Sequence, residues 1–379
     1  MTNECNKTDV IEEESCGGEI TIPFDPNKIR IRKDPFTLGQ LIEKIECKEV
    51  VFDTDFQRKD DLWDKEKQSR LIESVLLGFP LPSFYFDEPD GNDDNVLKEE
   101  RKWLVIDGLQ RCSTFRNFCV TKKLILSGLE YLVDFNGLGY DQLPRTLQRR
   151  INQTSITIFI LEKGTPINVK YNIFKRLNTG GLVLTPQEIR HAMNQGKPAD
   201  TIAKLSRLTS FKTATNYQIS TDRMEDRDFV TRFVAFYLQS YSKYQTDLDT
   251  FMTEGMASIR HLSDNECTKM ISDFDKSMNT AYEIFGEDAF RKREYGSDRR
   301  KPLNKALFEV LSVAFAKLTV LESDQLISKK EQFCEKFMDL NRQLYFKNSL
   351  TQSTGKPASV RHRHEGIAKI ISDTLSSTL

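Results

Sequence analysis

The sequence lacks the signatures of several common enzyme classes. It contains no Walker A phosphate loop, no H-E-x-x-H zinc motif, no G-x-S-x-G nucleophile turn and no C-x-x-C pair. The P-loop ATPase, zinc hydrolase and α/β-hydrolase classes therefore have no support. Histidine is scarce, with 4 residues. His362 and His364 are close in sequence, but no Cys or acidic residue is placed to complete a metal site with them, so no metal ligand is predicted.

Long apolar runs and a surplus of charge are also absent. No apolar stretch reaches transmembrane length, and residues 1–18 are polar and acidic, unlike a signal peptide. We therefore expect a cytoplasmic protein without a membrane partner. The 7 cysteines are odd in number and scattered, which favours reduced thiols. The net charge of −1 provides no general basic field, so any DNA-binding surface must be a local patch.

Hydrophobic patterning predicts an α+β protein with two ordered domains. Residues 1–19 read as a disordered tail, 20–195 as a mixed α/β N-terminal domain, and 196–379 as an all-α helical domain. In the first domain, strands are expected at 50–52, 83–86, 102–106 and 155–161, and helices at 36–45, 64–78, 108–120, 140–150 and 165–177. Helical stripes dominate the second domain: Phe229, Phe233, Phe236 and Tyr237, and Leu303, Leu307, Leu311 and Phe315.

The stretch 103–114 joins an apolar strand directly to a helix. The strand ends at Asp107-Gly108, and the start of the following helix offers backbone N–H groups to an anion. Gly108 would let a ligand approach the backbone, and Arg111 could hold a phosphate with its planar guanidinium. The alternative is a capping box between Asp107 and Gln110, with Arg111 solvated on the helix surface.

Two further segments could contribute to a ligand site. A loop after the strand at 50–52 carries Gln57 and Arg58, which suit a base or a phosphate; alternatively, this is a surface loop whose aromatic residues seal the core. The segment 174–181 ends a helix with two cations and paired glycines, which could form an anion nest or a plain glycine C-cap and turn. Its polar residues and glycines are Lys175, Arg176, Asn178, Thr179, Gly180 and Gly181.

Basic clusters occur at 149–150, 291–293, 299–301 and 361–364. Each alone is typical of a solvated face, but several on one side of the helical domain would form a surface for DNA phosphates. On this hypothesis the DNA-binding residues are Arg291, Arg293, Arg299, Arg300, Arg361 and Arg363.

The ordered series of motifs across 55–190 resembles the N-terminal domain family of the GmrSD-type restriction endonucleases, within the wider ParB/sulfiredoxin-like fold. The pieces that carry the resemblance are Phe56-Gln57-Arg58 with Trp63, the stretches 68–74 and 78–82, Ile106-Asp107-Gly108-Leu109-Gln110-Arg111, 174–181 and 184–190.

The resemblance implies a nucleoside-triphosphate-binding module followed by a helical domain. From the residues themselves, Asp107 could orient water or hold Mg²⁺. In the family an Asp-Gly-Gln-Gln-Arg motif is tied to nucleotide hydrolysis, so the catalytic residues would be Asp107, Gln110 and Arg111. Leu109 replaces the first Gln of that motif and cannot position water or phosphate, which puts hydrolysis in doubt. The implied nucleotide-binding residues are Gln57, Arg58, Gly108, Lys175, Arg176, Asn178, Thr179, Gly180 and Gly181.

The resulting hypothesis is a nucleotide-binding, NTP-hydrolysing, DNA-associated protein of a bacterial restriction or phage-defence type. One alternative is a ParB-like DNA clamp or sensor without hydrolysis, another is a metal-dependent DNA nickase, and a third is an interaction protein with a degenerate site. No His-Asn-His nuclease cluster is evident, so we expect a separate nuclease to perform any cleavage. The expected partners are DNA, that nuclease or another defence-system protein, and a second copy of the chain.

Overall fold

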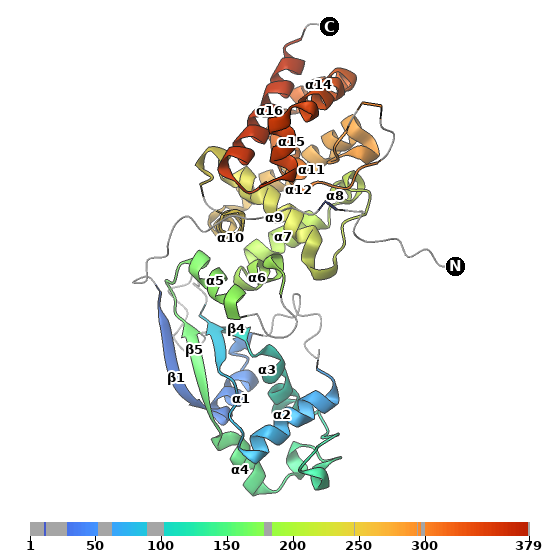
Figure 1. The fold of residues 1–379 in the computed structure, drawn as a ribbon. Coiled ribbons are helices and arrows are strands. Elements are labelled where there is room, and N and C mark those ends of the chain that lie inside the picture. The colour runs from blue at the N-terminus through green and yellow to red at the C-terminus, as the bar shows by residue number, and fades with distance from the viewer. Residues whose placement is uncertain are drawn as a thin grey trace, which may run out of the picture. The chain divides into compact units, whose positions relative to one another are not determined.

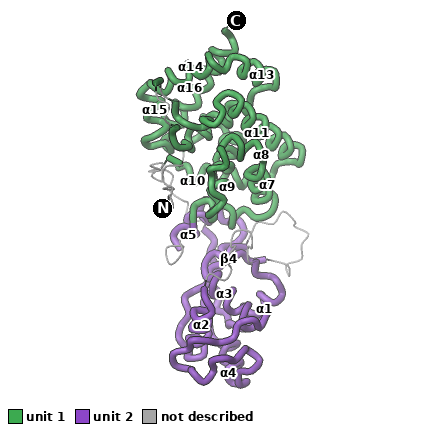
Figure 2. The backbone as a smooth tube through the Cα atoms, turned by 90° about the vertical axis from the view of Figure 1, so that its right-hand side faces the viewer, with its two compact units in different colours: residues 1–23, 185–379 green, residues 24–184 purple. Residues whose placement is uncertain are grey.

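The structure, a computed structural model, describes residues 11–12, 29–51, 63–88, 102–177, 184–245, 247–293, 295–296 and 300–377. Its contacts divide the chain into two compact units (Figure 2). We call residues 24–184 the sheet unit, and residues 1–23 with 185–379 the helical unit. None of the described helices is both long and apolar enough to cross a membrane. The predicted α+β class, with a small mixed sheet followed by a mostly helical region, is confirmed.

The sheet unit is built on five described strands in the order β1-β5-β3-β4-β2 (Figure 1). The β1–β5 and β3–β4 pairs are antiparallel, whereas β5–β3 and β4–β2 are parallel. The strands are β1 (Ile31–Thr37), β2 (Val50–Val51), β3 (Phe84–Asp87), β4 (Trp103–Asp107) and β5 (Ser155–Leu161). The helices are α1 (Leu38–Glu46), α2 (Lys65–Leu77), α3 (Leu109–Phe115), α4 (Arg145–Gln153) and α5 (Ile167–Leu177), and a π-helical turn, Arg116–Val120, continues α3.

Local sequence signals place several of these elements. Asp64 caps α2, because its carboxylate accepts the N–H of Lys67, and Gly78 ends the helix with a positive φ of 82°. The expected strand at 155–161 is confirmed. The region 140–150 differs from its prediction, since a 3-10 turn at Tyr140–Gln142 precedes α4. The unpredicted strand β1 pairs along its whole length with β5.

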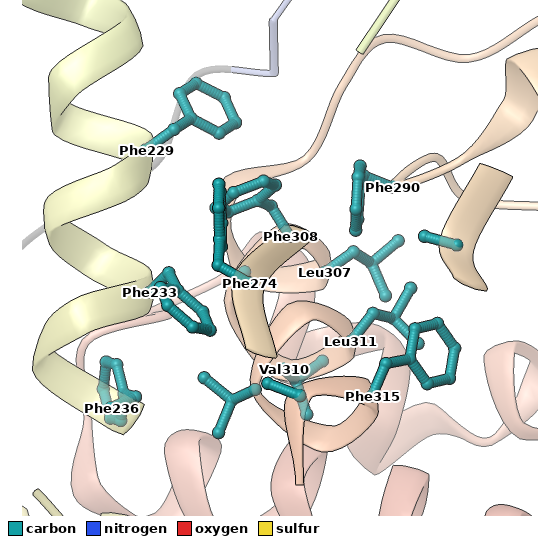
Figure 3. Packing of buried hydrophobic residues seen from close by; sticks show 14 of the residues in the cluster. Phe229, Phe233, Phe236, Phe274, Phe290, Leu307, Phe308, Val310, Leu311 and Phe315 are labelled. Atoms are coloured by element: carbon teal, nitrogen blue, oxygen red, sulfur yellow. The ribbon is translucent and has the colours of Figure 1, made fainter. Parts of the chain in front are cut away.

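The helical unit consists of helices packed around an aromatic core. Its α-helices are α6 (Pro186–Met193), α7 (Lys197–Ser206), α8 (Thr209–Ala214), α9 (Glu225–Leu238), α10 (Leu248–Ser258), α11 (Asp264–Phe285), α12 (Lys305–Ala316), α13 (Val320–Ser328), α14 (Lys330–Arg342), α15 (Leu344–Thr351) and α16 (Pro357–Leu375). Phe229 and Phe233 of α9 face Phe308 of α12 and Phe274 of α11 (Figure 3). Both predicted stripes are confirmed as core, with Tyr237 partly buried at its edge.

The division of the chain falls after Leu184, whereas the sequence suggested 195. Helix α6 accounts for the difference, because Arg190 bonds to Asp228 and Asp249 of the helical unit. Two residues of the expected tail are also docked there. Ile11 forms a β-bridge with Leu303, and Glu12 forms an ion pair with Lys292 of 2.5 Å.

Candidate functional site

The turn between β4 and α3 is organised around Gly108. Its φ of 101° and ψ of 14° make it the left-handed N-cap of α3, and no side-chain hydrogen bond from the described residues caps this helix. The alternative of an Asp107–Gln110 capping box is therefore wrong. A Cβ on Gly108 would lie 2.7 Å from Cδ1 of Phe84 and 3.2 Å from Nη2 of Arg111. Backbone conformation and close packing both require glycine here, independently of any ligand.

Arg111 is buried beneath this turn, with 8% of its surface exposed. Its guanidinium donates to the carbonyl oxygen of Pro82, to that of Ser83 at 3.1 Å and to Oδ2 of Asp107 at 3.1 Å. Burial lowers the pKa of Arg111, and the nearby carboxylate of Asp107 opposes that shift. The solvated Arg111 of the capping-box alternative does not fit this burial. The described contacts fasten the chain before β3 to the end of β4.

Asp107 is more accessible than its partner. Its side chain is 45% exposed, although one carboxylate oxygen accepts the hydrogen bond from Arg111. An exposed carboxylate held at the end of a strand can meet water or a cation. Of Asp107 and Arg111, Asp107 is therefore the residue whose functional group is more open to solvent.

Gln110 takes part in a chain of hydrogen bonds that the sequence did not reveal. Its Oε1 accepts the backbone N–H of Trp63 at 3.2 Å, and Nε2 of Gln68 donates to the carbonyl oxygen of Trp63 at 2.8 Å. Nδ2 of Asn117, in the π-helical turn, donates in turn to Oε1 of Gln68 at 3.3 Å. The chain ties the start of α2 to α3 and gives Gln110 a positioning role. Gln68 lies within one of the motifs quoted above, but no spacing rule pointed to its partner.

The cations at the end of α5 are exposed. Lys175 and Arg176 occupy its last turn, where a positive charge interacts favourably with the helix dipole. Helix α5 begins near the end of β3, since Lys170 in its first turn forms a buried ion pair of 2.7 Å with Asp87, the last residue of that strand. Asp107 pairs with Tyr85 near the start of β3. The Lys170–Asp87 pair was not predicted.

Several proposed site residues lie outside the described residues. These are Gln57, Arg58, Asn178, Thr179, Gly180, Gly181 and Arg299.

Two arginines assigned to DNA contact are instead part of the interior of the helical unit. Arg291 is 3% exposed and donates to the carbonyl oxygen of Lys301 at 2.5 Å and to Oε1 of Gln218 at 2.5 Å. Arg363 is fully buried and bonds to both carboxylate oxygens of Glu309, at 2.8 Å each. Neither guanidinium can contact a phosphate without leaving these partners, so the DNA-binding prediction for both residues is wrong.

The other described arginines of that hypothesis do not form one surface of unengaged charge. Arg293 donates to Sγ of Cys334 at 3.6 Å, and Arg300 pairs with Glu287 and with Asp288. Arg361 is exposed. Among the described residues, no three His, Cys, Asp or Glu side chains gather as a metal site would require.

The sheet unit is thus an α+β unit whose strand–glycine–helix turn carries Asp107 and Arg111. Residues 38–194 match the family described as GmrSD restriction endonuclease, N-terminal domain. This match confirms, for the matched segment, the resemblance inferred from the motifs. No curated protein and no solved structure matches the chain, so the likeness to the ParB/sulfiredoxin fold stays a prediction.

Proposed function

We propose that this protein binds a nucleoside triphosphate in its sheet unit and acts in association with DNA in restriction or phage defence. The observation that carries the proposal is the family match over 38–194, which includes both the Asp107–Arg111 turn and the cations of α5. The family name refers to restriction endonucleases, whose substrate is DNA. A separate nuclease remains the proposed agent of any cleavage.

The described residues of the sheet unit would have different roles in binding the nucleotide. The exposed carboxylate of Asp107 is an oxygen ligand of the kind that Mg²⁺ prefers, and Mg²⁺ would neutralise charge on the phosphates. Lys175 and Arg176 offer exposed positive charge for the phosphates. Arg111 and Gln110 hold the turn in place through Pro82, Ser83 and the backbone of Trp63.

Leu109 favours a second candidate, in which nucleotide binding switches the protein without hydrolysis. Its side chain packs against the hydrophobic core of the sheet unit. A leucine in that position supplies no hydrogen bond for an attacking water, whereas catalysis of phosphoryl transfer depends on positioning and charge. Release of inorganic phosphate in the presence of Mg²⁺ separates the two candidates: sustained turnover supports hydrolysis, and binding without turnover supports the sensor.

The first test of nucleotide binding is thermal stability of the full chain against a panel of triphosphates with and without Mg²⁺. At roughly a hundredfold excess over Kd, a ligand stabilises by about 2.7 kcal/mol, which raises the melting temperature by a few degrees. We expect the shift to shrink in Asp107→Asn and in Lys175→Gln/Arg176→Gln. The matched control is Lys269→Gln/Lys347→Gln, two exposed residues of the helical unit. An unchanged melting temperature with every triphosphate contradicts nucleotide binding.

A further inference from the structure

Helix α4 of the sheet unit is strongly basic and largely exposed. Its nine residues, Arg145–Gln153, include Arg145, Arg149 and Arg150, all exposed, and only Ile151 is buried. No acidic residue occurs in the sequence between Asp141 and Glu162, and Asp141 is itself paired with Lys122 at 2.8 Å. The positive charge of α4 therefore has no compensating carboxylate on its own helix.

The arginines of α4 are presented on a fixed support. Ile151 belongs to the core of the sheet unit, and α4 packs closely on α1, since a Cβ on Gly39 would lie 2.9 Å from the carbonyl oxygen of Asn152. Nη2 of Arg150 donates to the carbonyl oxygen of Leu77 at 3.3 Å, at the end of α2. Figure 1 shows α4 beside α2 in the sheet unit. The helix cannot rotate its charged face inward without losing these contacts.

Arg145 and Arg149 carry no ion pair or side-chain hydrogen bond in the described part of the chain. They are four positions apart, so their side chains lie on the same face of the helix, where like charges repel. Bringing a polyanion to this face would relieve the repulsion. In the helical unit, by contrast, Arg291 and Arg363 are buried and Arg300 is paired with acidic residues.

We propose that the exposed face of α4, formed by Arg145, Arg149 and Arg150, binds the phosphate backbone of duplex DNA. This inference rests on the proposed DNA association, and it places the DNA-binding surface on the sheet unit instead of the helical unit. Three arginines spaced along one short helix match a polyanion better than a single ligand, because successive phosphates repeat along the backbone. Such contacts confer affinity and orientation without reading the base sequence.

The test is binding of a short fluorescent duplex by the full chain, measured by anisotropy over a range of salt concentrations. In Arg145→Gln/Arg149→Gln/Arg150→Gln, we expect affinity to fall about tenfold or more and the slope of log K against log salt to become shallower by about 2 to 3. Arg145→Gln/Arg149→Gln should give an intermediate loss and leaves the bond from Arg150 to Leu77 intact. Circular dichroism and melting temperature verify that both variants fold.

The matched control is Arg207→Gln/Lys269→Gln/Lys347→Gln, which removes the same charge from exposed positions of the helical unit. Equal losses in the control and the α4 variants would reduce the effect to net charge and overturn the proposal. Wild-type affinity and salt slope in both α4 variants would overturn it while leaving DNA association intact. If the wild-type protein binds no duplex with or without nucleotide, the DNA association itself fails, whereas the triphosphate melting shift tests nucleotide binding separately.

Discussion

The guanidinium of Arg111 lies over the ring of Phe84, with its central carbon 4.3 Å from the ring centroid. The same group donates hydrogen bonds to the backbone of Pro82 and Ser83. A planar, delocalised cation can stack on a ring and donate in several directions at once, which an ammonium group cannot. Arg111 thereby joins the start of β3 to the turn after β4.

Replacing Arg111 by lysine should destabilise the protein although the charge is kept. We expect a loss of about 2–4 kcal/mol, because the stacked and hydrogen-bonded guanidinium is buried. Asp107→Asn should cost under about 1 kcal/mol, since the side chain of Asp107 is 45% exposed and its ion pair is screened by water. Urea unfolding of both single variants measures this. Equal losses in the two would contradict the positioning role of Arg111.

Gly108→Ala should be more costly than a glycine replacement that changes backbone conformation alone. Gly108 has a φ of 101°, and its Cβ would meet Phe84 at 2.7 Å, whereas Gly137 has a φ of 84° and nothing within 4 Å of its Cβ. We expect about 1 kcal/mol for Gly137→Ala and about 2–4 kcal/mol for Gly108→Ala. The difference between their unfolding free energies isolates the close packing. A smaller loss at Gly108 would show that Phe84 moves aside.

The sequence predicted elements whose signals are local. The stripe of Phe229, Phe233 and Phe236 has helical spacing and lies in the core, and the helix expected at 64–78 is present as α2. Strand β1 was missed because its residues are largely polar and exposed. Only its pairing with β5, from Ile31 opposite Leu161 to Thr37 opposite Ser155, makes it a strand.

Basic clusters were misinterpreted for a related reason. Arg361 and Arg363 belong to the same basic cluster in the sequence, but residues two positions apart on a helix point to nearly opposite sides. Arg361 is exposed, whereas Arg363 is buried against Glu309. The sequence alone did not specify which side of α16 faces the core. The hydrogen bond from the backbone N–H of Trp63 to Gln110 could not be predicted from the sequence either, since it joins residues far apart in the chain.

Glu73 should make stability dependent on acid pH. It is 3% exposed and accepts the backbone N–H groups of Glu130 at 3.1 Å, Tyr131 at 2.7 Å and Leu132 at 2.8 Å. Desolvation raises its pKa, but these donors outweigh that effect and hold the pKa below its usual value. A lowered folded-state pKa gives stability that is present above the unfolded value, about 4.3, and is lost as pH falls through the folded one.

The variant Glu73→Gln should therefore lose about 1.5–3 kcal/mol at neutral pH and show a weaker decline in stability below about pH 4. Glu66→Gln, at an exposed position of the same helix, is the control and should change stability by under about 0.5 kcal/mol. Urea unfolding at several pH values measures both. A parallel acid dependence in wild type and Glu73→Gln would argue against this role of the carboxylate.

Glu309 is the centre of a buried charge cluster in the helical unit. It is fully buried and bonds to Arg232 at 2.7 Å, to Arg363, and to Nε2 of His364 at 3.1 Å. Desolvation raises the pKa of Glu309, but the two guanidinium groups and His364 outweigh it and place the pKa well below its usual range. The carboxylate is therefore charged when the protein is folded at neutral pH, and its stabilisation is lost only as pH falls far into the acid range.

Glu309→Gln should consequently be the most destabilising of these variants. The substitution nearly preserves volume but removes the carboxylate charge that pairs with two buried guanidinium groups, which costs about 3–5 kcal/mol. Glu365→Gln, exposed on α16 next to His364, should change stability by under about 0.5 kcal/mol. Urea unfolding of the full chain measures both variants. A loss below about 1 kcal/mol in Glu309→Gln would contradict this role of the Glu309 carboxylate, because it would mean that other groups compensate the charges of Arg232 and Arg363.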